Sequence, residues 1–402
     1  MKVVVVGAGH AAGQLVAALR MQQFEGDIRL IGEEPYPPYQ RPPLSKQYLS
    51  GEIDLESVYF KPADFYDQAK AELSLSLRVE AIDRSGKTVT LSDGSGVDYD
   101  KLVLATGTRV RKLTLPGADL EGVHYLRSIE DTDAISRDLR PGARIVVCGG
   151  GYIGLEVAAA AVKKGAAVTV LEMADRVMNR VVAPVVSAFY EDLHKANGVD
   201  IRTDVKVSGF EGSGRVEKVV TEGGEDFAAD LVVVGVGVIP NTELAEEAGL
   251  ACDNGIVVNE FAQTEDPDIL ACGDCTNHPS AIYGINVRLE SVQNAVDQAN
   301  AVAKTICGVP TPYIAVPWFW SDQYDVKLQI VGLSQGYDQA VVRGDPAGGS
   351  FSVFYLKKGR LIAVDAINSP REYMMGRKLI SEGAEPDPEK IVNTDISVKE
   401  LV

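Results

Sequence analysis

Two glycine-rich segments of this sequence have the residue types and the spacing that hold the phosphates of a nucleotide. The first glycine of such a segment permits a tight turn, the second lets the backbone approach a pyrophosphate, and the third position needs a small residue where helix and strand pack. Each segment here follows an apolar, β-branched run, which predicts a strand, a turn and a helix whose N-terminus binds one dinucleotide. The six positions are Gly7, Gly9 and Ala12 in the first segment and Gly149, Gly151 and Gly154 in the second.

An acidic residue ends the second strand expected after each glycine-rich segment. These residues are Glu33 and Glu172, and a carboxylate at this position accepts hydrogen bonds from ribose hydroxyls. At the first site the neighbouring Glu34 remains an alternative. At the second site Glu172 repels a 2′-phosphate and favours NADH over NADPH, although Arg176 lies close enough in the sequence to oppose this preference.

Two dinucleotide sites in one chain need two similar domains to position them. After each glycine-rich segment the sequence returns to an apolar strand that ends in glycine, at residues 101–107 and 231–237. This weak internal repeat predicts two Rossmann-like domains, each with a buried parallel sheet. The economical interpretation is electron transfer between a nicotinamide and a flavin, because these groups exchange a hydride.

Three further segments complete the predicted organisation. Five prolines between residues 35 and 43 predict a fixed irregular segment, because their rings exclude helix and central strand. A helix is expected over residues 290–306. Alternating residues beyond position 317 predict an antiparallel sheet and one helix, over residues 327–331, 340–343, 351–356 and 361–366 for the strands and 371–381 for the helix. We therefore predict an α/β fold with two Rossmann-like domains and a C-terminal α+β domain.

Composition excludes several classes of function. The chain has 402 residues and a formal net charge of −18, so no excess of Lys and Arg is available to neutralise nucleic-acid phosphates. Its five cysteines are odd in number and irregularly spaced, which argues against a disulfide framework or a metal site. No signal-peptide pattern and no apolar run of about 18 residues is present, so we expect a cytoplasmic protein without membrane contact.

Taken together, these residues resemble a known family over essentially the whole chain. The chain resembles the FAD-dependent, NADH-dependent ferredoxin reductases that serve cytochromes P450 and aromatic-ring dioxygenases. The motifs that carry the resemblance are residues 39–46, 149–156, 271–275, 290–295 and 317–323. The resemblance implies a fold like that of glutathione reductase. Its expected domains are an FAD domain of residues 1–115 and 241–316, an NAD domain of residues 116–240 and a C-terminal domain of residues 317–402.

The resemblance also implies which residues contact FAD. Lys46 would lie near the flavin ring, and Trp320 would cover the ring where electrons leave, although Trp320 is also compatible with a core position. Asp274 would bind the ribityl and phosphate region, as an aspartate that caps a helix after a glycine turn. The remaining expected FAD contacts are Arg41, Ala105, Thr106, Gly107, Arg109 and Val292.

For the second site, the resemblance implies that Glu156 approaches Lys46 near the flavin N5. A nearby ammonium stabilises the negative charge of a reduced flavin, and a carboxylate partner orients that ammonium. The expected catalytic residues are therefore Lys46, Glu156 and Trp320. Further expected contacts of the nicotinamide nucleotide are Tyr152, Ile153 and Gly237.

By this resemblance, electrons pass from NADH through FAD to a two-iron two-sulfur ferredoxin, which supplies a cytochrome P450 or an aromatic-ring oxygenase. The expected assembly is a monomer or a weak dimer. Such ferredoxins are usually acidic, and this chain is acidic too, so a local basic patch is expected to receive the partner. The candidates for this patch are Arg288, Lys327 and Arg343.

Two alternative functions remain open at this point. An NADH oxidase or peroxidase usually needs a redox-active cysteine near residues 40–46, and no cysteine occurs there. A flavoprotein like apoptosis-inducing factor would bind DNA, which the net charge of −18 disfavours. Cys272 and Cys275 have redox spacing, but they flank Asp274 and are interpreted as small buried residues. His10 is interpreted as a packing residue, and no metal site is expected.

Overall fold

The computed structural model describes residues 1–62 and 64–401, which form two compact units. The first unit contains Met1–Gln40, Leu55–Arg109 and Val238–Pro317, and the second contains Arg41–Asp54, Val110–Gly237 and Trp318–Val402. The segment Arg41–Asp54 thus groups with the later parts of the chain, in line with the expected approach of Lys46 to Glu156. The three-domain boundaries stay a prediction.

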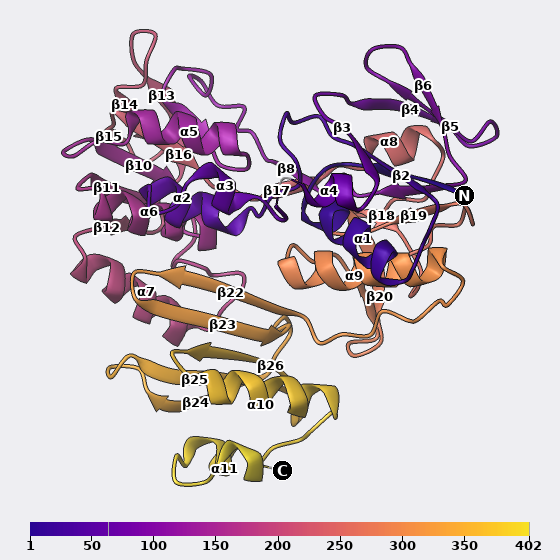
Figure 1. The fold of residues 1–402 in the computed structure, drawn as a ribbon. Helices are drawn as coiled ribbons and strands as arrows, with labels where there is room; N and C mark the ends of the chain where they lie inside the picture. Colours follow the sequence, from indigo (N-terminus) through magenta and orange to yellow (C-terminus); the bar gives the residue numbers. More distant parts are fainter. Residues whose placement is uncertain (63, 402) are drawn as a thin grey trace. The chain divides into compact units, whose positions relative to one another are not determined.

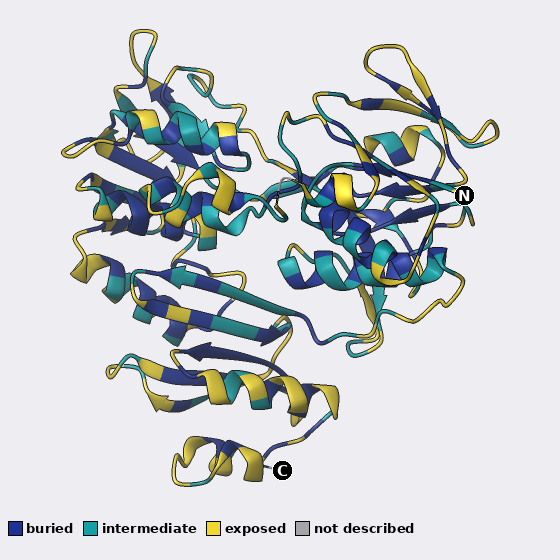
Figure 2. Cartoon of the chain, in the orientation of Figure 1, coloured by how far each residue is buried: buried dark blue, intermediate teal, exposed yellow. Residues whose placement is uncertain are grey.

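The first unit is built on a five-stranded parallel sheet whose strand order is β19-β7-β1-β2-β3. Its central strand is buried along Val3–Val6, as a strand covered on both faces must be. Figure 2 shows the strands of this sheet largely in the dark blue of buried residues. The strands are β1 (Lys2–Val6), β2 (Asp27–Ile31), β3 (Ala71–Ser74), β7 (Lys101–Leu104) and β19 (Ile269–Ala271).

Helices α1 (His10–Met21) and α9 (Val292–Ile306) pack against each other and cover one face of this sheet through a shared apolar core (Figure 1). The helix expected over residues 290–306 is therefore confirmed. The other elements of the unit are α3 (Leu55–Val58), α4 (Phe65–Gln68), β4 (Val79–Asp83), β5 (Thr88–Leu91), β6 (Gly96–Asp98), β8 (Thr108–Val110), β17 (Val238–Pro240), α8 (Glu243–Glu247), β18 (Ile256–Val257), β20 (Thr276–Ser280) and β21 (Ile285–Val287).

The second unit contains another five-stranded parallel sheet, with the order β12-β11-β10-β16-β9. Helix α6 (Tyr152–Lys163) follows β10 just as α1 follows β1, so the repeat predicted from the sequence is present in the structure. The remaining elements here are η1 (Pro42–Ser45), α2 (Gln47–Ser50), β9 (Val123–Tyr125), α5 (Ile129–Asp138), β10 (Arg144–Cys148), β11 (Ala167–Leu171), α7 (Pro184–Ala196), β12 (Asp200–Arg202), β13 (Val207–Glu211), β14 (Lys218–Thr221), β15 (Asp226–Ala228) and β16 (Leu231–Val234).

The C-terminal part of the second unit is a five-stranded antiparallel sheet with the order β22-β23-β26-β25-β24, as the alternating pattern predicted. Helix α10 (Pro370–Ser381) packs on β23 and β26. The strands are β22 (Trp318–Gln323), β23 (Val326–Gly332), β24 (Gln339–Asp345), β25 (Ser350–Lys357) and β26 (Arg360–Ile367). Two short helices, α11 (Pro388–Val392) and η2 (Val398–Glu400), end the described chain.

Two local predictions are wrong. The proline-rich segment contains the 3-10 turn η1, which tolerates its prolines because they occupy the first positions, where no N–H is needed. Asp274 does not cap a helix, because strands β20 and β21 come between it and α9, whose cap is Ser291.

A buried carboxyl group links β26 to the parallel-sheet part of the second unit. Asp365 is fully buried and accepts a hydrogen bond from the hydroxyl of Tyr355, which itself accepts one from the backbone N–H of Ala183. The other oxygen of Asp365 and the hydroxyls of Tyr152 and Tyr190 have no partner among the described residues. Burial raises the pKa of Asp365 to about 7, so the folded protein holds a proton there at mildly acidic pH.

This proton predicts a pH-dependent stability that Asp365→Asn should abolish. The folded state retains the proton above pH 3.8, where the unfolded chain releases it, so the contribution is complete below pH 3.8 and is lost as the pH rises through about 7. The unfolding free energy of the native protein, measured relative to that of Asp365→Asn, should fall by about 4 kcal/mol from pH ~4 to pH ~8. Denaturant titrations of the two proteins measure this difference. The control is the exposed Asp325→Asn, which keeps Asp365 and should therefore follow the pH dependence of the native protein. A parallel pH dependence of Asp365→Asn and the native protein would contradict the expectation.

Candidate nucleotide sites and the Lys46–Glu156 pair

The first glycine-rich turn has the steric features of a pyrophosphate cradle. Gly7 has a φ of +106°, and a Cβ atom there would lie 2.3 Å from the carbonyl oxygen of Ala105. Gly9, in contrast, faces open space, with no heavy atom within 4 Å of where its Cβ would be. Ala12, in the first turn of α1, is fully buried. The turn thus leaves a space in front of Gly9 that a pyrophosphate can fill.

The second turn repeats this arrangement. Gly149 has a φ of +113°, and its Cβ would lie 2.5 Å from the carbonyl oxygen of Gly235. A Cβ on Gly154 would lie 2.1 Å from the carbonyl oxygen of Gly149, whereas Gly151 again faces open space. The same three roles, namely turn, approach and close packing, are therefore present twice.

The helices that leave these turns present unsatisfied N–H groups. Gly9 caps α1 and Gly151 caps α6, and neither cap makes a side-chain hydrogen bond. Neither helix has an acidic residue in its first turn. The positive end of each helix dipole is thus left for an external anion, and both sites fit the pyrophosphate of a dinucleotide.

The expected FAD contacts of the first unit meet at one edge of its sheet. The carboxyl ends of four adjacent parallel strands lie along this edge, which is where ligands bind in such sheets. The residues that follow these strands are Asp274 after β19, Ala105, Thr106 and Gly107 after β7, Gly7 and Gly9 after β1, and Glu33 after β2. The topology therefore brings together residues that are far apart in the sequence.

The side chains at this edge differ in how free they are. The Glu33 side chain is 72% exposed and forms a long ion pair of 4.0 Å with Arg78, whereas Glu34 accepts a hydrogen bond of 2.6 Å from the hydroxyl of Tyr39. This difference favours Glu33 as the ribose acceptor. Arg109 donates to Asn241 and forms an ion pair with Glu243, so a pyrophosphate would compete with both.

Two further positions complete the first site. Val292 is the first residue of α9, directly after its Ser291 cap, so its backbone N–H also belongs to a helix N-terminus. His10 packs its ring on Phe60, at 4.4 Å between centroids, and burial lowers the pKa of His10 to about 4. This supports the interpretation of His10 as a neutral packing residue.

In the second site, the carboxylate of Glu172 is hydrogen-bonded to the backbone of the glycine-rich turn and of the segment that follows Glu172 itself. Its two carboxylate oxygens accept hydrogen bonds from the N–H of Gly150, at 2.7 Å, and of Ala174, at 2.8 Å. Arg176 donates to the carbonyl groups of Val182 and Asn179 and to the hydroxyl of Ser187. The guanidinium that could have attracted a 2′-phosphate is therefore held by protein acceptors.

The other residues expected at this site differ in exposure. Ile153 is 45% exposed, and Gly237 has a φ of +97° with open space where its Cβ would be. Tyr152 packs its ring on Phe319, at 4.9 Å between centroids, and its hydroxyl is buried. We infer that Tyr152 contributes its backbone N–H, in the first turn of α6, to the binding of the nucleotide. Ile153 and Gly237 are exposed and can contact the nucleotide directly.

Lys46 and Glu156 form a largely buried ion pair, as the resemblance implied. Lys46 Nζ lies 2.6 Å from Glu156 Oε2, and the exposed fractions of their side chains are 12% and 4%. Ser45 donates to the same carboxylate oxygen at 2.5 Å, and Ser321 donates to the other oxygen at 2.7 Å. Three charged or hydroxyl donors thus satisfy one buried carboxylate.

Two more residues expected near the flavin belong to the same unit. Arg41 donates to the carbonyl oxygen of Arg127. Trp320 lies on β22, with its ring 5.7 Å from that of Trp318, and it is only partly buried. A partly buried ring is available to a ligand, in contrast to the alternative of a core aromatic. The contact of Arg41, Lys46 and Trp320 with FAD remains a prediction.

The family models match this architecture. A pyridine nucleotide-disulphide oxidoreductase model covers residues 1–299, and a reductase C-terminal model covers residues 318–402. The chain belongs to the pyridine nucleotide-disulphide oxidoreductase family. Its cofactors are FAD and NAD(H), which fit the two turns described above.

Curated relatives cover the full length of the chain. Putidaredoxin reductase CamA of Pseudomonas putida is 47% identical over 100% of this chain and 96% of that protein. Rhodocoxin reductase of Rhodococcus erythropolis is 45% identical over 99% of this chain and 94% of that protein. These values confirm the resemblance inferred from the motifs.

Solved structures confirm the fold. A covalent putidaredoxin reductase–putidaredoxin complex superposes with a TM-score of 0.97 at 47% identity, covering 100% of this chain and 97% of that chain. The ferredoxin reductase for the CYP199A2 system from Rhodopseudomonas palustris gives a TM-score of 0.96 at 44% identity, with 99% and 98% covered. Among the described residues, no helix has the length and apolar character needed to cross a bilayer.

The cysteines of this member are not arranged for disulfide chemistry. Cys272 and Cys275 are free thiols with no exposed surface, which confirms that they are small buried residues. Burial raises the pKa of both thiols, so neither is a ready nucleophile. Cys272 and Cys275 pack in two different apolar clusters of the first unit.

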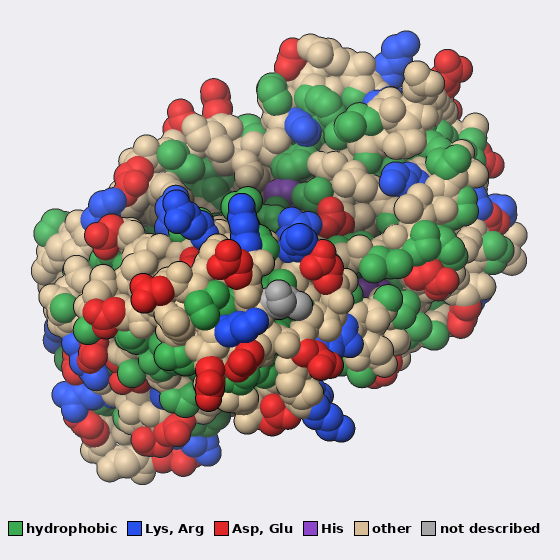
Figure 3. Space-filling view, turned by 90° about the horizontal axis from the view of Figure 1, so that it is seen from below, with side chains coloured by type: hydrophobic (Ala, Val, Ile, Leu, Met, Phe, Trp, Pro, Cys, Tyr) green, Lys and Arg blue, Asp and Glu red, His purple; other side chains and the backbone are tan. Residues whose placement is uncertain are grey.

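The expected basic patch is only partly supported. Arg343 is wrong as a docking residue, because it is 6% exposed and donates to the carbonyl groups of Ile391, Asn393 and Ile396. Arg288 is largely buried and forms an ion pair with Glu290. Lys327 is exposed. On the face drawn in Figure 3, basic side chains are interspersed with acidic ones.

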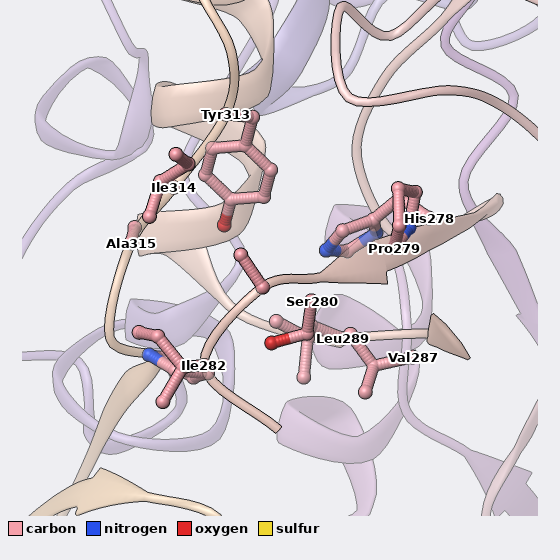
Figure 4. A pocket seen from close by; sticks show the side chains of 11 residues that line it. His278, Pro279, Ser280, Ile282, Val287, Leu289, Tyr313, Ile314 and Ala315 are labelled. Atoms are coloured by element: carbon pink, nitrogen blue, oxygen red, sulfur yellow. The ribbon is translucent and has the colours of Figure 1, made fainter. Parts of the chain in front are cut away.

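A small pocket in the first unit lies apart from the residues predicted from the sequence. The hairpin β20–β21 and the segment before β22 form it, and Figure 4 shows His278 and Tyr313 on its wall among mostly apolar side chains. Burial lowers the pKa of His278 to about 4, so its ring is neutral. None of the expected site residues lines this pocket.

Sequence reasoning predicted Lys46 as the partner of Glu156 but missed its two hydroxyl donors, Ser45 and Ser321. Ser45 lies in the motif 39–46 and Ser321 in the motif 317–323, so both residues belong to segments that the sequence analysis had singled out. What the sequence lacked was the approach of β22 to α6, which brings residues 165 positions apart into hydrogen-bond distance. Gln323 and His194, which continue these contacts, were missed for the same reason.

The two open glycines predict a pair of complementary variants. Gly151→Ala should leave the fold intact, because its Cβ meets no atom, but should raise the KM for NADH by about 10-fold or more by blocking the pyrophosphate. Gly9→Ala should instead weaken FAD retention. Thermal stability of the apoproteins, FAD content and NADH kinetics separate the two effects. Normal NADH kinetics in Gly151→Ala would contradict the assignment of the second turn.

Proposed function

We propose that this protein is a flavoprotein reductase that takes electrons from NADH and passes them through FAD to a ferredoxin. The observation that carries this proposal is the presence of two complete pyrophosphate cradles in a chain without accessible paired cysteines. FAD is assigned to the cradle of the first unit and NADH to that of the second. The full-length similarity to putidaredoxin reductase and rhodocoxin reductase supports the same activity.

A bound flavin supplies the conversion between the electron pair of a nicotinamide and the single electrons of an iron–sulfur cluster. The protein supplies a fixed positive charge, because Glu156 and its hydroxyl donors hold the ammonium of Lys46 in a site with little water. Because the ammonium of Lys46 is already fixed in position, no protein group has to reorient when negative charge develops nearby. Trp320 is assigned to the ring edge.

The partner is proposed to be a two-iron two-sulfur ferredoxin that supplies a cytochrome P450 or an aromatic-ring oxygenase, in the cytoplasm. One relative of known structure was solved in covalent complex with putidaredoxin, which supports a small protein as electron acceptor. We also infer a monomer or weak dimer.

Exposed cations of the second unit offer a docking surface for an acidic partner. Arg371 and Arg377 of α10 are exposed and form no ion pair with other described residues. Tyr373, on the same helix, lies 6.5 Å from the ring of Trp318, next to the strand that carries Trp320. Together with Lys327 these residues provide local positive charge on a chain of net charge −18.

The geometry around Glu172 predicts a preference for NADH. Its carboxylate is fixed by two backbone donors, and Arg176 is engaged elsewhere, so a 2′-phosphate meets repulsion without compensation. Steady-state kcat/KM should be at least about 10-fold higher for NADH than for NADPH. Glu172→Gln should narrow this ratio, and equal use of the two nucleotides by the native protein would contradict the prediction.

The central test is anaerobic rapid mixing of the FAD-loaded protein with NADH, followed by a candidate ferredoxin. We expect NADH to bleach the flavin absorbance and the ferredoxin to restore it. The second step should slow as ionic strength rises, because screening weakens the attraction between the basic surface and the partner.

A variant and its control locate the basic surface. Arg377→Glu should slow reoxidation by ferredoxin but not bleaching by NADH, whereas Lys195→Glu, an exposed charge on α7, should alter neither. Rapid reoxidation by oxygen with no response to any ferredoxin would instead favour the oxidase alternative. A chain that binds FAD but transfers no electrons would favour the signalling alternative.

A further inference from the structure

The carboxylate of Glu156 is the end point of a chain of hydrogen bonds that extends well beyond Lys46. Ser321 Oγ, which donates to Glu156, accepts from Gln323 Nε2 at 3.1 Å. Gln323 Oε1 lies 2.8 Å from His194 Nε2, and His194 Nδ1 lies 3.1 Å from the hydroxyl of Tyr324. The chain therefore links α6, β22 and α7, all within the second unit.

The chain lies in the interior of this unit. Ser321, Gln323 and His194 have no exposed surface, and Glu156 is 4% exposed. Only Tyr324, at the far end, is partly open to solvent. Groups buried to this degree are normally present because they are paired, and each of these side chains is paired with the next.

One direction of donation satisfies every member. A carboxylate accepts only, so Ser321 must donate to Glu156 and must therefore accept from the amide N–H of Gln323. The amide oxygen of Gln323 then faces His194, which must donate from Nε2; a neutral His194 then accepts at Nδ1 from Tyr324. The ionised state of Glu156 thus fixes the orientation of an amide and the tautomer of an imidazole.

A neutral His194 is consistent with this direction. Burial is the main cause that lowers the pKa of His194, with the hydrogen bond to Gln323 opposing it. The other titratable groups near the chain are Lys46, Tyr190 on α7, Asp322 on β22 and Asp365 on β26. Of these, only Lys46 contacts Glu156 directly.

We propose that Ser321, Gln323, His194 and Tyr324 are positioning residues that keep Glu156 ionised and thereby hold the Lys46 ammonium in place. This inference rests on the function proposed above, because it concerns the charge that Lys46 presents to the flavin. Each donor in the chain is polarised by the next, so the effect on the carboxylate weakens with distance from Glu156.

The imidazole of His194 gives a readout that does not depend on the flavin. ¹⁵N NMR of the histidine side chains, with His194→Asn used for assignment among the four histidines, reports which ring nitrogen carries the proton. We expect a neutral imidazole protonated at Nε2 near neutral pH, with or without FAD. An Nδ1–H tautomer or an imidazolium would overturn the proposal.

The second readout is the pH profile of flavin reduction by NADH in the FAD-loaded protein. Loss of a donor destabilises the charged carboxylate, so the acid side of the profile should move to higher pH. The expected shift is about one pH unit for Ser321→Ala, less for Gln323→Leu and least for Tyr324→Phe. Ser352→Ala is the matched control, because the hydroxyl of Ser352 is buried on β25 but has no partner among the described residues, and its profile should not move.

The order of these shifts separates positioning from packing. A purely structural role would lower stability without shifting the profile, and unshifted profiles in folded, FAD-loaded variants would overturn the proposal. The tautomer measurement covers the case in which a variant fails to fold. If instead the native protein is not reduced by NADH, the proposed function fails while the tautomer result still decides the hydrogen-bond direction.

Discussion

A buried carboxylate that must stay paired is the constraint on which the second unit depends. Glu156 lies on α6, and its two carboxylate oxygens accept hydrogen bonds from two other parts of the chain, the Ser45–Lys46 segment and β22. Breaking one partner of such a pair leaves an uncompensated charge, whereas the intact pair contributes little net stability. The residues around Glu156 are therefore better explained by the charge that Lys46 presents than by a need for a stable core.

The two nucleotide turns show how a steric requirement becomes a binding preference. Gly7 and Gly149 are required by their own backbones, because a side chain would meet a carbonyl oxygen of the adjacent strand. Gly9 and Gly151 are not required by the protein at all, since nothing lies where their Cβ atoms would be. A glycine that the fold does not need is explained by a ligand, and both such glycines cap a helix without a protein partner.

The sequence predicted those parts that depend on local pattern. Both βαβ units, the α9 helix and the antiparallel sheet followed from periodicity and glycine spacing, and the Lys46–Glu156 pair followed from the resemblance. Prediction from the sequence failed for residues whose surroundings are set by packing between distant parts of the chain. Arg343 has the charge of a docking residue, but it is buried on β24 under the C-terminal segment, where its guanidinium donates to three carbonyl groups. The roles of Ser321 and His194 could not be predicted, because they depend on which strand packs beside α6, and the sequence does not show that packing.

The buried cysteines also bear on where electrons can go. In reductases of the glutathione type, a cysteine pair near the position of Leu44–Lys46 receives electrons from the flavin, and this chain has none there. Cys272 and Cys275 do not replace it, because burial raises the pKa of both thiols and leaves them inaccessible to a partner. The burial of Cys272 and Cys275 thus supports the proposal that electrons pass from the bound flavin directly to a partner protein. The partly buried Trp320 and the exposed cations of α10 are the observations that support the proposed approach of an acidic acceptor to the second unit.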